Sequence, residues 1–217
     1  AASPAPSGSL IDRLLASAAR CHLLGHLVGE EQRHPAPAEL DALIADALAR
    51  LDRTMPQFKD HFPAPSSESG TYAPIDNVEW TNGFWTGMLW LAWQMTGRAA
   101  YRAAADENVA SFLDRVKRRI NVDHHDLGFL YTLSACAAHQ LTGSEGGRAA
   151  GLEAAKLLLG RFDGVANVIQ AWGDMRDPAQ RGRMIIDCNL NLPLLFWAGR
   201  ETGDPSFRDA ATRHLRQ

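Results

Sequence analysis

The chain has 217 residues, of which 46% are hydrophobic, and its formal net charge is −3 at pH 7. This length and composition suffice for one sizeable hydrophobic core, so we expect one folded domain. The chain has no excess of basic residues with which to neutralise phosphates, and we therefore expect neither nucleic acid nor a membrane surface as a partner. No uninterrupted apolar segment approaches the roughly 20 residues that a membrane-spanning helix needs.

The three cysteines, Cys21, Cys136 and Cys188, are odd in number and widely spaced. This pattern predicts neither a disulfide framework nor a zinc site. A reducing compartment fits it best, and we expect a cytoplasmic protein.

Residues 1–9 are small, proline-rich and uncharged. They lack the basic start and apolar centre of a secretion signal, and we expect a disordered leader. Apolar residues then recur every three or four positions along residues 10–28 and 38–51, which predicts two amphipathic helices. Residues 55–74 contain four prolines and Gly70, and we expect a long loop there.

Three segments without Asp, Glu, Lys or Arg follow, at residues 81–97, 127–144 and 188–199. Each reads as a largely buried helix that ends at or near a Thr-Gly pair, and a charged, amphipathic helix comes after each. This internal repeat of helical hairpins predicts an all-α fold with two concentric layers, an α/α toroid or an arc of one, of which the chain carries about four hairpins. No segment has the sustained alternation of a strand.

In such a ring, the loops that enter the inner helices open on one rim. Trp80, Asp126 and Asp187 precede the first, second and third uncharged helix. Pro193 reads best in the first turn of a helix, which leaves Asp187 in the loop before it.

The two aspartates allow more than one interpretation. Each could be a helix cap, and the run Asp123-His124-His125-Asp126 could also hold a metal, although adjacent histidines rarely aim at one ion. Two acids at equivalent rim positions favour catalysis. In a site shielded from water, repulsion between two carboxylates keeps one of them protonated, and that one can act as an acid. Asp187 follows three apolar residues and is the better candidate for the protonated member. We expect no metal and no cofactor.

The six tryptophans divide into two groups. Trp80 and Trp172 fall in expected loops, where exposed indoles beside acids suit the apolar face of a sugar ring. The others lie inside expected helices, and we interpret them as core: Trp85, Trp90, Trp93 and Trp197.

Four segments together resemble the unsaturated glucuronyl hydrolases, glycoside hydrolase family 88. They are residues 79–87 (Glu-Trp-Thr-Asn-Gly-Phe-Trp-Thr-Gly), 123–129 (Asp-His-His-Asp-Leu-Gly-Phe), 170–173 (Gln-Ala-Trp-Gly) and 183–197. The resemblance covers most of the chain from about Glu79 onward. It implies an (α/α)6 toroid of six hairpins, so residues 10–217 would form the N-terminal part of the catalytic domain.

The resemblance also implies an activity. Such enzymes remove a 4,5-unsaturated uronic acid from the non-reducing end of oligosaccharides left by polysaccharide lyases, by hydrating the vinyl ether. By this likeness Asp187 is the catalytic acid and base and Asp126 assists it, while Trp80, His125 and Trp172 bind the sugar.

Two alternatives stay open: an unsaturated rhamnogalacturonyl hydrolase, and a non-catalytic carbohydrate-binding α/α module. The partner expected is an unsaturated oligosaccharide. An incomplete ring would also leave apolar inner faces exposed, which favours self-association.

Overall fold

The computed structural model describes residues 37–217. The expected leader and the helix expected at residues 10–28 lie outside this range. The helix expected at residues 38–51 is α2 (Pro37–Thr54), which runs into a short 3-10 helix, η1 (Met55–Phe58).

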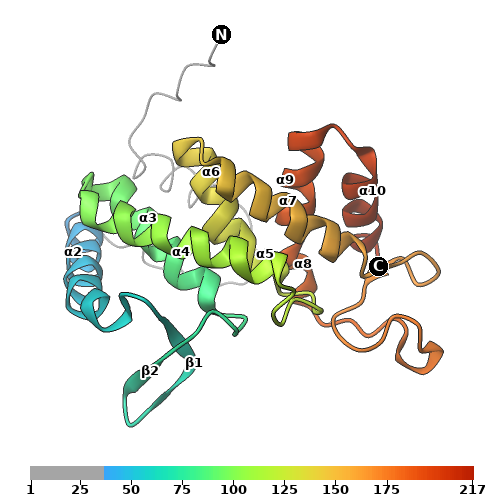
Figure 1. Cartoon of the computed structure of the whole chain (residues 1–217), viewed down its shortest axis with the longest axis horizontal. Coiled ribbons are helices and arrows are strands. Elements are labelled where there is room, and N and C mark those ends of the chain that lie inside the picture. Colours follow the sequence, from blue (N-terminus) through green and yellow to red (C-terminus); the bar gives the residue numbers. More distant parts are fainter. Residues whose placement is uncertain (1–36) are drawn as a thin grey trace, which may run out of the picture.

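The helices after residue 80 form the two predicted layers (Figure 1). The inner layer contains α3 (Asn82–Thr96), then α5 (Leu127–Tyr131) with η2 (Thr132–Cys136) and α6 (Ala137–Thr142), then α8 (Cys188–Asn191) with α9 (Pro193–Thr202). The outer layer contains α4 (Ala99–Lys117), α7 (Glu145–Leu159) and α10 (Pro205–His214). The fold is therefore an arc of an α/α toroid, as predicted.

Glycines end the three inner helices, as the Thr-Gly pairs predicted. Gly97, Gly143 and Gly203 have φ values of 69°, 74° and 75°, and each donates its N–H to a carbonyl of the last helical turn. This left-handed conformation is nearly free of steric cost only for glycine. Each chain reversal from the inner to the outer layer is thus encoded locally.

The core lies between the layers. Tyr101, Phe112 and Val116 on α4 are completely buried, and the Phe112 ring meets the Tyr131 ring of α5 edge-on at 5.5 Å. Burying each such side chain contributes about 1.5–3 kcal/mol. The apolar face of α4 therefore holds this helix against the inner layer, as expected for the amphipathic helix that follows the first uncharged segment.

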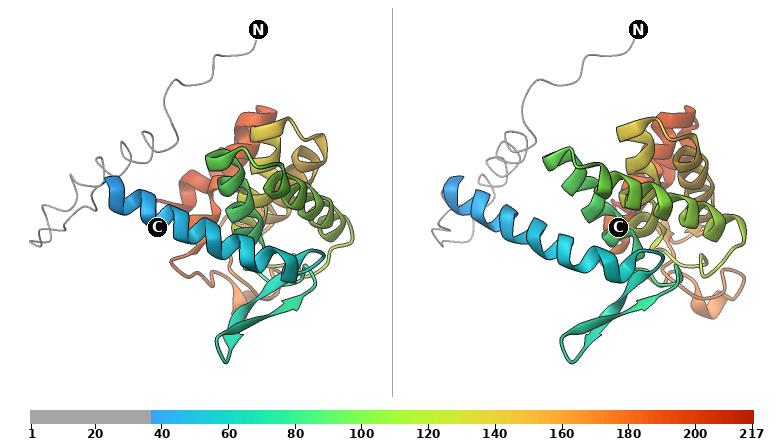
Figure 2. Two further views of the ribbon diagram at one scale, coloured as in Figure 1. Left: turned by 90° about the vertical axis from the view of Figure 1, so that its left-hand side faces the viewer. Right: turned by 60° about the vertical axis from the view of Figure 1, so that its left-hand side comes forward.

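The prediction of a long loop at residues 55–74 is wrong for most of this segment, which begins with η1 and continues as a hairpin. Strands β1 (Phe62–Glu68) and β2 (Thr71–Ile75) form an antiparallel hairpin that projects from the helices (Figure 2). Its two-residue turn, Ser69-Gly70, has positive φ at both positions (51° and 78°), which suits a twisted ribbon. The prolines in this segment argued against strands in the sequence. Each strand of a two-stranded ribbon is an edge strand, however, where proline is tolerated.

Short strands also form in the loop between α7 and α8, where none was expected. Strand β3 (Phe162–Asp163) pairs with β4 (Val168–Ile169), and a 3-10 turn, η3 (Pro178–Gln180), follows. Strands of two residues are too short to show an alternation of apolar and polar residues in the sequence. The pairing fixes the start of the segment that carries Trp172.

The second inner helix is interrupted by a π turn, η2, at Thr132–Cys136. Ser134 Oγ donates to the Leu130 carbonyl at 2.5 Å, and the Ser134 carbonyl accepts from the Trp90 indole N–H at 3.1 Å. A π turn loosens the carbonyl ladder of a helix, and here a buried indole from α3 takes up one of its carbonyls.

One face of the inner layer is apolar and exposed. Met88 and Leu91 on α3 are each 47% exposed, and Leu190 on α8 is 65% exposed. The expectation that residues 81–97 form a helix buried on most sides is therefore wrong for this face. The arc leaves open the side that a complete ring would enclose.

Within residues 37–217, no helix is long and apolar enough to cross a membrane.

Candidate active site

The rim predicted from the sequence exists. Asp126 and Asp187 are the N-cap residues of α5 and α8, and Trp80 lies two residues before α3. Neither aspartate side chain accepts a hydrogen bond from its own helix, whereas Ser144 and Asp204 do cap α7 and α10. Capping therefore does not account for the two rim carboxylates.

Two glycines let the inner helices meet at this rim. A Cβ on Gly83 of α3 would lie 2.1 Å from the carbonyl oxygen of Phe129. A Cβ on Gly128 of α5 would lie 2.2 Å from the Cα of Asn191 on α8. Such distances are far inside van der Waals contact, so only glycine permits the three helix starts to pack this closely.

Asn191 connects the two helices that carry the acids. Its side chain is buried, accepts from the Phe129 N–H at 2.7 Å and donates to the Asp187 carbonyl at 3.1 Å. Both polar ends of the amide are thus used between α5 and α8. Nothing in the sequence pointed to this role beyond an amide within an uncharged segment.

His125 brings the two acids together. Its Nε2 lies 3.0 Å from Oδ1 of Asp187 and 3.2 Å from Oδ1 of Asp126. Its Nδ1 lies 3.1 Å from the Ala171 carbonyl oxygen. His125 is buried, and the side chains of Asp126 and Asp187 are 16% and 33% exposed, so the cluster opens to solvent on the Asp187 side.

His124 holds the other side of Asp126. The Nε2 of His124 lies 2.9 Å from the Asn121 carbonyl, and its Nδ1 lies 3.2 Å from both the Asp126 N–H and Asp126 Oδ2. A carbonyl only accepts, so Nε2 carries the proton, and the Nδ1 lone pair accepts from the Asp126 N–H. This neutral tautomer fixes the backbone of Asp126.

Two buried arginines fix the rim loops. The Arg115 guanidinium donates to five oxygens in the loops before α3 and α5, those of Asn77, Val78, Glu79, Ile120 and Asn121. Arg161 donates to the carbonyls of Gln170 and Gly173 and to Asp123. Sequence reasoning missed both residues, because each stands near other charged residues and looks solvated.

The predicted division of the tryptophans is confirmed by burial. Trp80 and Trp172 are 43% and 45% exposed, whereas Trp85, Trp90 and Trp197 are buried and Trp93 packs partly buried against the core. The Trp80 ring lies 6.4 Å from Phe84 and 6.0 Å from Phe129. Trp172 follows Ala171, whose carbonyl faces His125. Exposed indoles thus lie on two loops, one before α3 and one that also carries Ala171, the contact of His125.

A metal could use one group among the described residues. His125, Asp187 and Cys188 offer ligand atoms within 4.8 Å of one another. Ligands around a tetrahedral zinc ion lie closer, about 3.5 Å apart. Burial raises the pKa of the Cys188 thiol, with the charges of Asp187 and Asp126 adding to the effect, so the neutral thiol is favoured over the thiolate that binds metal.

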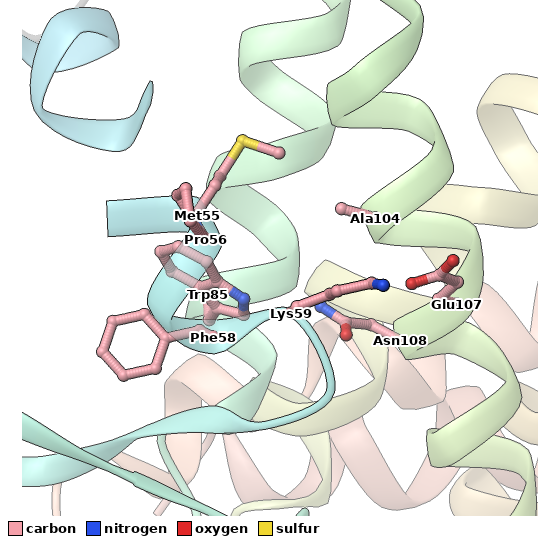
Figure 3. Close-up of a pocket in the computed structure, with 8 residues that line it drawn as sticks. All are labelled: Met55, Pro56, Phe58, Lys59, Trp85, Ala104, Glu107 and Asn108. Carbon is pink, nitrogen blue, oxygen red and sulfur yellow. The ribbon is translucent and has the colours of Figure 1, made fainter. Parts of the chain in front are cut away.

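The pocket drawn in Figure 3 lies elsewhere, between η1, α3 and α4, and has a volume of about 300 Å³. Neither acid lines it. Its walls are Met55, Pro56, Phe58, Lys59, Trp85, Ala104, Glu107 and Asn108. The candidate site is thus the open rim and not this pocket.

Known proteins of one family are similar to this chain. Residues 51–217 match the model of Glycosyl Hydrolase Family 88. An unsaturated glucuronyl hydrolase of Bacillus sp. (strain GL1) is 49% identical over 171 residues, which are 79% of this chain and 45% of that protein. The chain thus spans less than half the length of this relative.

Solved structures of an unsaturated glucuronyl hydrolase from Streptococcus agalactiae are also similar. One superposes with a TM-score of 0.82 at 40% identity and covers 85% of this chain and 46% of the other. A mutant of that enzyme, complexed with dGlcA-GalNAc6S, superposes with a TM-score of 0.73 at 36% identity and covers 85% of this chain and 44% of the other.

Proposed function

The chain belongs to glycosyl hydrolase family 88, and from this membership together with its rim acids we propose that it serves to remove a 4,5-unsaturated uronic acid from the non-reducing end of lyase-generated oligosaccharides. The observation that carries the proposal is the convergence of Asp126 and Asp187 on one imidazole nitrogen. Glycosaminoglycan disaccharides are the substrate class that we favour, since a similar structure contains dGlcA-GalNAc6S.

The proposed reaction hydrates a vinyl ether. Asp187 gives a proton to C4, and the C4=C5 electron pair forms the new C–H bond, which leaves an oxocarbenium-like centre at C5. A water molecule adds its oxygen to C5 and returns a proton to the Asp187 carboxylate. The resulting hemiketal opens and releases the sugar, so Asp187 ends the cycle protonated.

The surroundings of Asp187 suit this task. Its side chain is the most exposed of the three groups in the cluster and can reach a sugar on the rim. Asp126 is more deeply placed, orients the substrate, and keeps negative charge beside Asp187 so that one proton stays in the cluster. Trp80 and Trp172 would pack on the apolar face of the sugar.

Replacing Asp187 by Asn tests the proposal. We expect loss of the substrate's double-bond ultraviolet absorbance for the wild type, with deuterium from heavy water at C4, and a rate at least about 100-fold lower for Asp187→Asn. Asp209→Asn, an exposed acid of α10, is the matched control. A near-normal rate for Asp187→Asn would contradict the assignment of Asp187. A wild type that binds the sugar as tightly as Asp187→Asn does, but does not turn it over, would favour a binding module.

We also propose that residues 10–217 form the N-terminal part of an α/α-toroid domain, and that the open apolar face on α3 and α8 drives self-association of this chain. Met88, Leu91 and Leu190 support the second point, since soluble monomers rarely expose contiguous apolar patches. Light scattering should give a mass above that of one chain, and a monomer would contradict it.

Finally, we propose a cytoplasmic location. Cys136 and Cys188 are both free and buried, which suits a reducing compartment. Cell fractionation with an antibody to the protein tests this proposal, which recovery outside the cytoplasm would contradict.

A further inference from the structure

The hydrogen bonds of His125 determine which of its ring nitrogens carries a proton. Its Nδ1 faces the Ala171 carbonyl at 3.1 Å, and the His125 backbone N–H donates to the same oxygen at 2.9 Å. A carbonyl oxygen only accepts, so Nδ1 must be protonated. In the neutral ring, Nε2 then has a lone pair and no hydrogen.

This lone pair faces two carboxyl oxygens. Asp187 Oδ1 and Asp126 Oδ1 lie 3.0 Å and 3.2 Å from Nε2. Without a proton among the three groups, three acceptors would face one another with no donor, in a cluster where His125 is almost fully buried. One proton must therefore lie among Nε2 and the two carboxyl groups.

We propose that His125 is the positioning residue that retains the working proton beside Asp187, by sharing it between Nε2 and the Asp187 carboxyl and returning it to Asp187 for delivery to C4. The delivery of this proton to the substrate rests on the proposed function. The location of the proton rests only on the hydrogen-bond geometry. In one form Asp187 is protonated and His125 is neutral. In the other form His125 is an imidazolium between two carboxylates, and the total charge is the same.

The neighbouring groups leave this exchange undisturbed. Among the described residues, the other titratable groups near Nε2 and its partners are Cys188 on α8 and His124 behind Asp126. Burial raises the pKa of the Cys188 thiol, so it stays neutral. The hydrogen bonds of His124 make it the neutral Nε2–H tautomer. Neither of these two groups competes for the proton that Asp187 must deliver to C4.

The role predicts a change in pH dependence when Nε2 is removed. A free imidazole holds a proton up to about pH 6.5 and a free carboxyl only to about pH 4. Without imidazole, the proton depends on the carboxyl pair alone and is lost at lower pH. The amide nitrogen of asparagine reaches roughly the Nδ1 position, so His125→Asn can still donate to Ala171 and lacks only Nε2.

The kinetic experiment compares His125→Asn with the wild type. We expect kcat at pH 7 to fall by about 100-fold, with KM changed less than about threefold, and the alkaline limb of the kcat profile to move to lower pH by roughly one unit or more. The matched control is His139→Asn, because His139 also has Nδ1 on a backbone carbonyl (Ser144, 3.2 Å) and Nε2 near a carboxylate (Glu201, 3.5 Å) but lies on α6. It should keep the wild-type profile.

A second measurement does not need turnover. Nitrogen-15 NMR of labelled histidine in the wild-type chain should show His125 as the Nδ1–H tautomer. The nitrogen-15 shift of His125 Nε2 should change in Asp187→Asn and in Asp126→Asn, because an oxygen of each carboxyl lies within 3.2 Å of that nitrogen in the wild type. Asp209→Asn should leave it unchanged.

The outcomes separate the inference from the proposed function. An Nε2–H tautomer, or a nitrogen-15 shift of Nε2 that neither Asp variant changes, overturns the shared proton. If the wild type turns over substrate and His125→Asn keeps the normal pH profile, the inference fails and the function stands. If the NMR signature is present and no unsaturated oligosaccharide is hydrated, the function fails and the shared proton stands.

Discussion

Gly128 is the position where a single methyl group should do most damage to the site. It lies in the first turn of α5, and a Cβ there would be 2.2 Å from the Cα, 2.4 Å from the carbonyl oxygen and 2.6 Å from the side-chain oxygen of Asn191. Two of these three atoms belong to the backbone and cannot rotate away. Carbon atoms in contact lie about 3.5 Å apart, so Gly128→Ala has to separate α5 from α8 by roughly 1 Å.

The expected magnitude follows from two opposing effects. Alanine in place of glycine gains about 1 kcal/mol of helix propensity. Overpacking costs about 1–3 kcal/mol, and a rigid backbone neighbour places this site at the upper end. We expect a net loss of about 2 kcal/mol, which lowers the Tm by about 4–8 °C in a chain of this size. A misplacement of about 1 Å between Asp126 and Asp187 should also reduce kcat by about 100-fold.

Thermal unfolding followed by circular dichroism at about pH 7, with turnover measured in parallel, tests this reasoning. Gly146→Ala on α7 is the matched control, because a Cβ there would meet only side-chain atoms at 3.8 Å and 4.0 Å. It should be neutral or gain about 0.5 kcal/mol. A Gly128→Ala variant as stable and active as the wild type would refute the close packing of the two helix starts.

Three further predictions concern buried polar groups. Arg115→Lys should lower the free energy of urea unfolding by about 3 kcal/mol, because lysine cannot donate to all five loop oxygens; a loss below about 1 kcal/mol would contradict this. Asn191→Asp sets a carboxylate oxygen against the Asp187 carbonyl in place of a donor, and kcat should fall about tenfold with the helical dichroism kept; unchanged kcat would count against the bridge. Burial lowers the pKa of His214, so the unfolded chain binds that proton more readily and unfolding free energy is lost as pH falls below about 6.5. His214→Gln should lose less between about pH 7.5 and pH 5 in urea titrations, and an equal loss would exclude His214 as a cause.

The helices could be predicted because their signals are local. Absence of charge marked the inner helices, and the glycines at 97, 143 and 203 marked their ends. The hairpin at Phe62–Ile75 could not, because prolines ordinarily argue against strands and the Ser69-Gly70 turn is a weak signal. This missed hairpin shows that the rule against proline in strands applies to central strands and not to edge strands.

The acid pair could be predicted as well, since equivalent positions of a repeat lie on the same rim. The partners of these acids could not. His125 was expected to contact sugar, and that role stays a prediction, but its ring nitrogens face Ala171 and the two acids. A backbone carbonyl 46 residues away leaves no mark in the sequence. Likewise the Arg115 guanidinium is buried partly by the loop at Asn77–Glu79, 36 to 38 residues earlier in the chain, which leaves no local signal.

The π turn at Thr132–Cys136 lies between α5, which Asp126 begins, and α6. Each residue of an α-helix turns the chain by about 100°, and a π turn holds an additional residue within a helix that otherwise continues. The side chains before η2 are therefore rotated about the helix axis relative to those after it, compared with an uninterrupted α-helix. A homologue with one residue fewer in this turn would keep α6 in place and rotate its rim acid away from Asp187, so alignments of this region should tolerate substitutions but not a deletion.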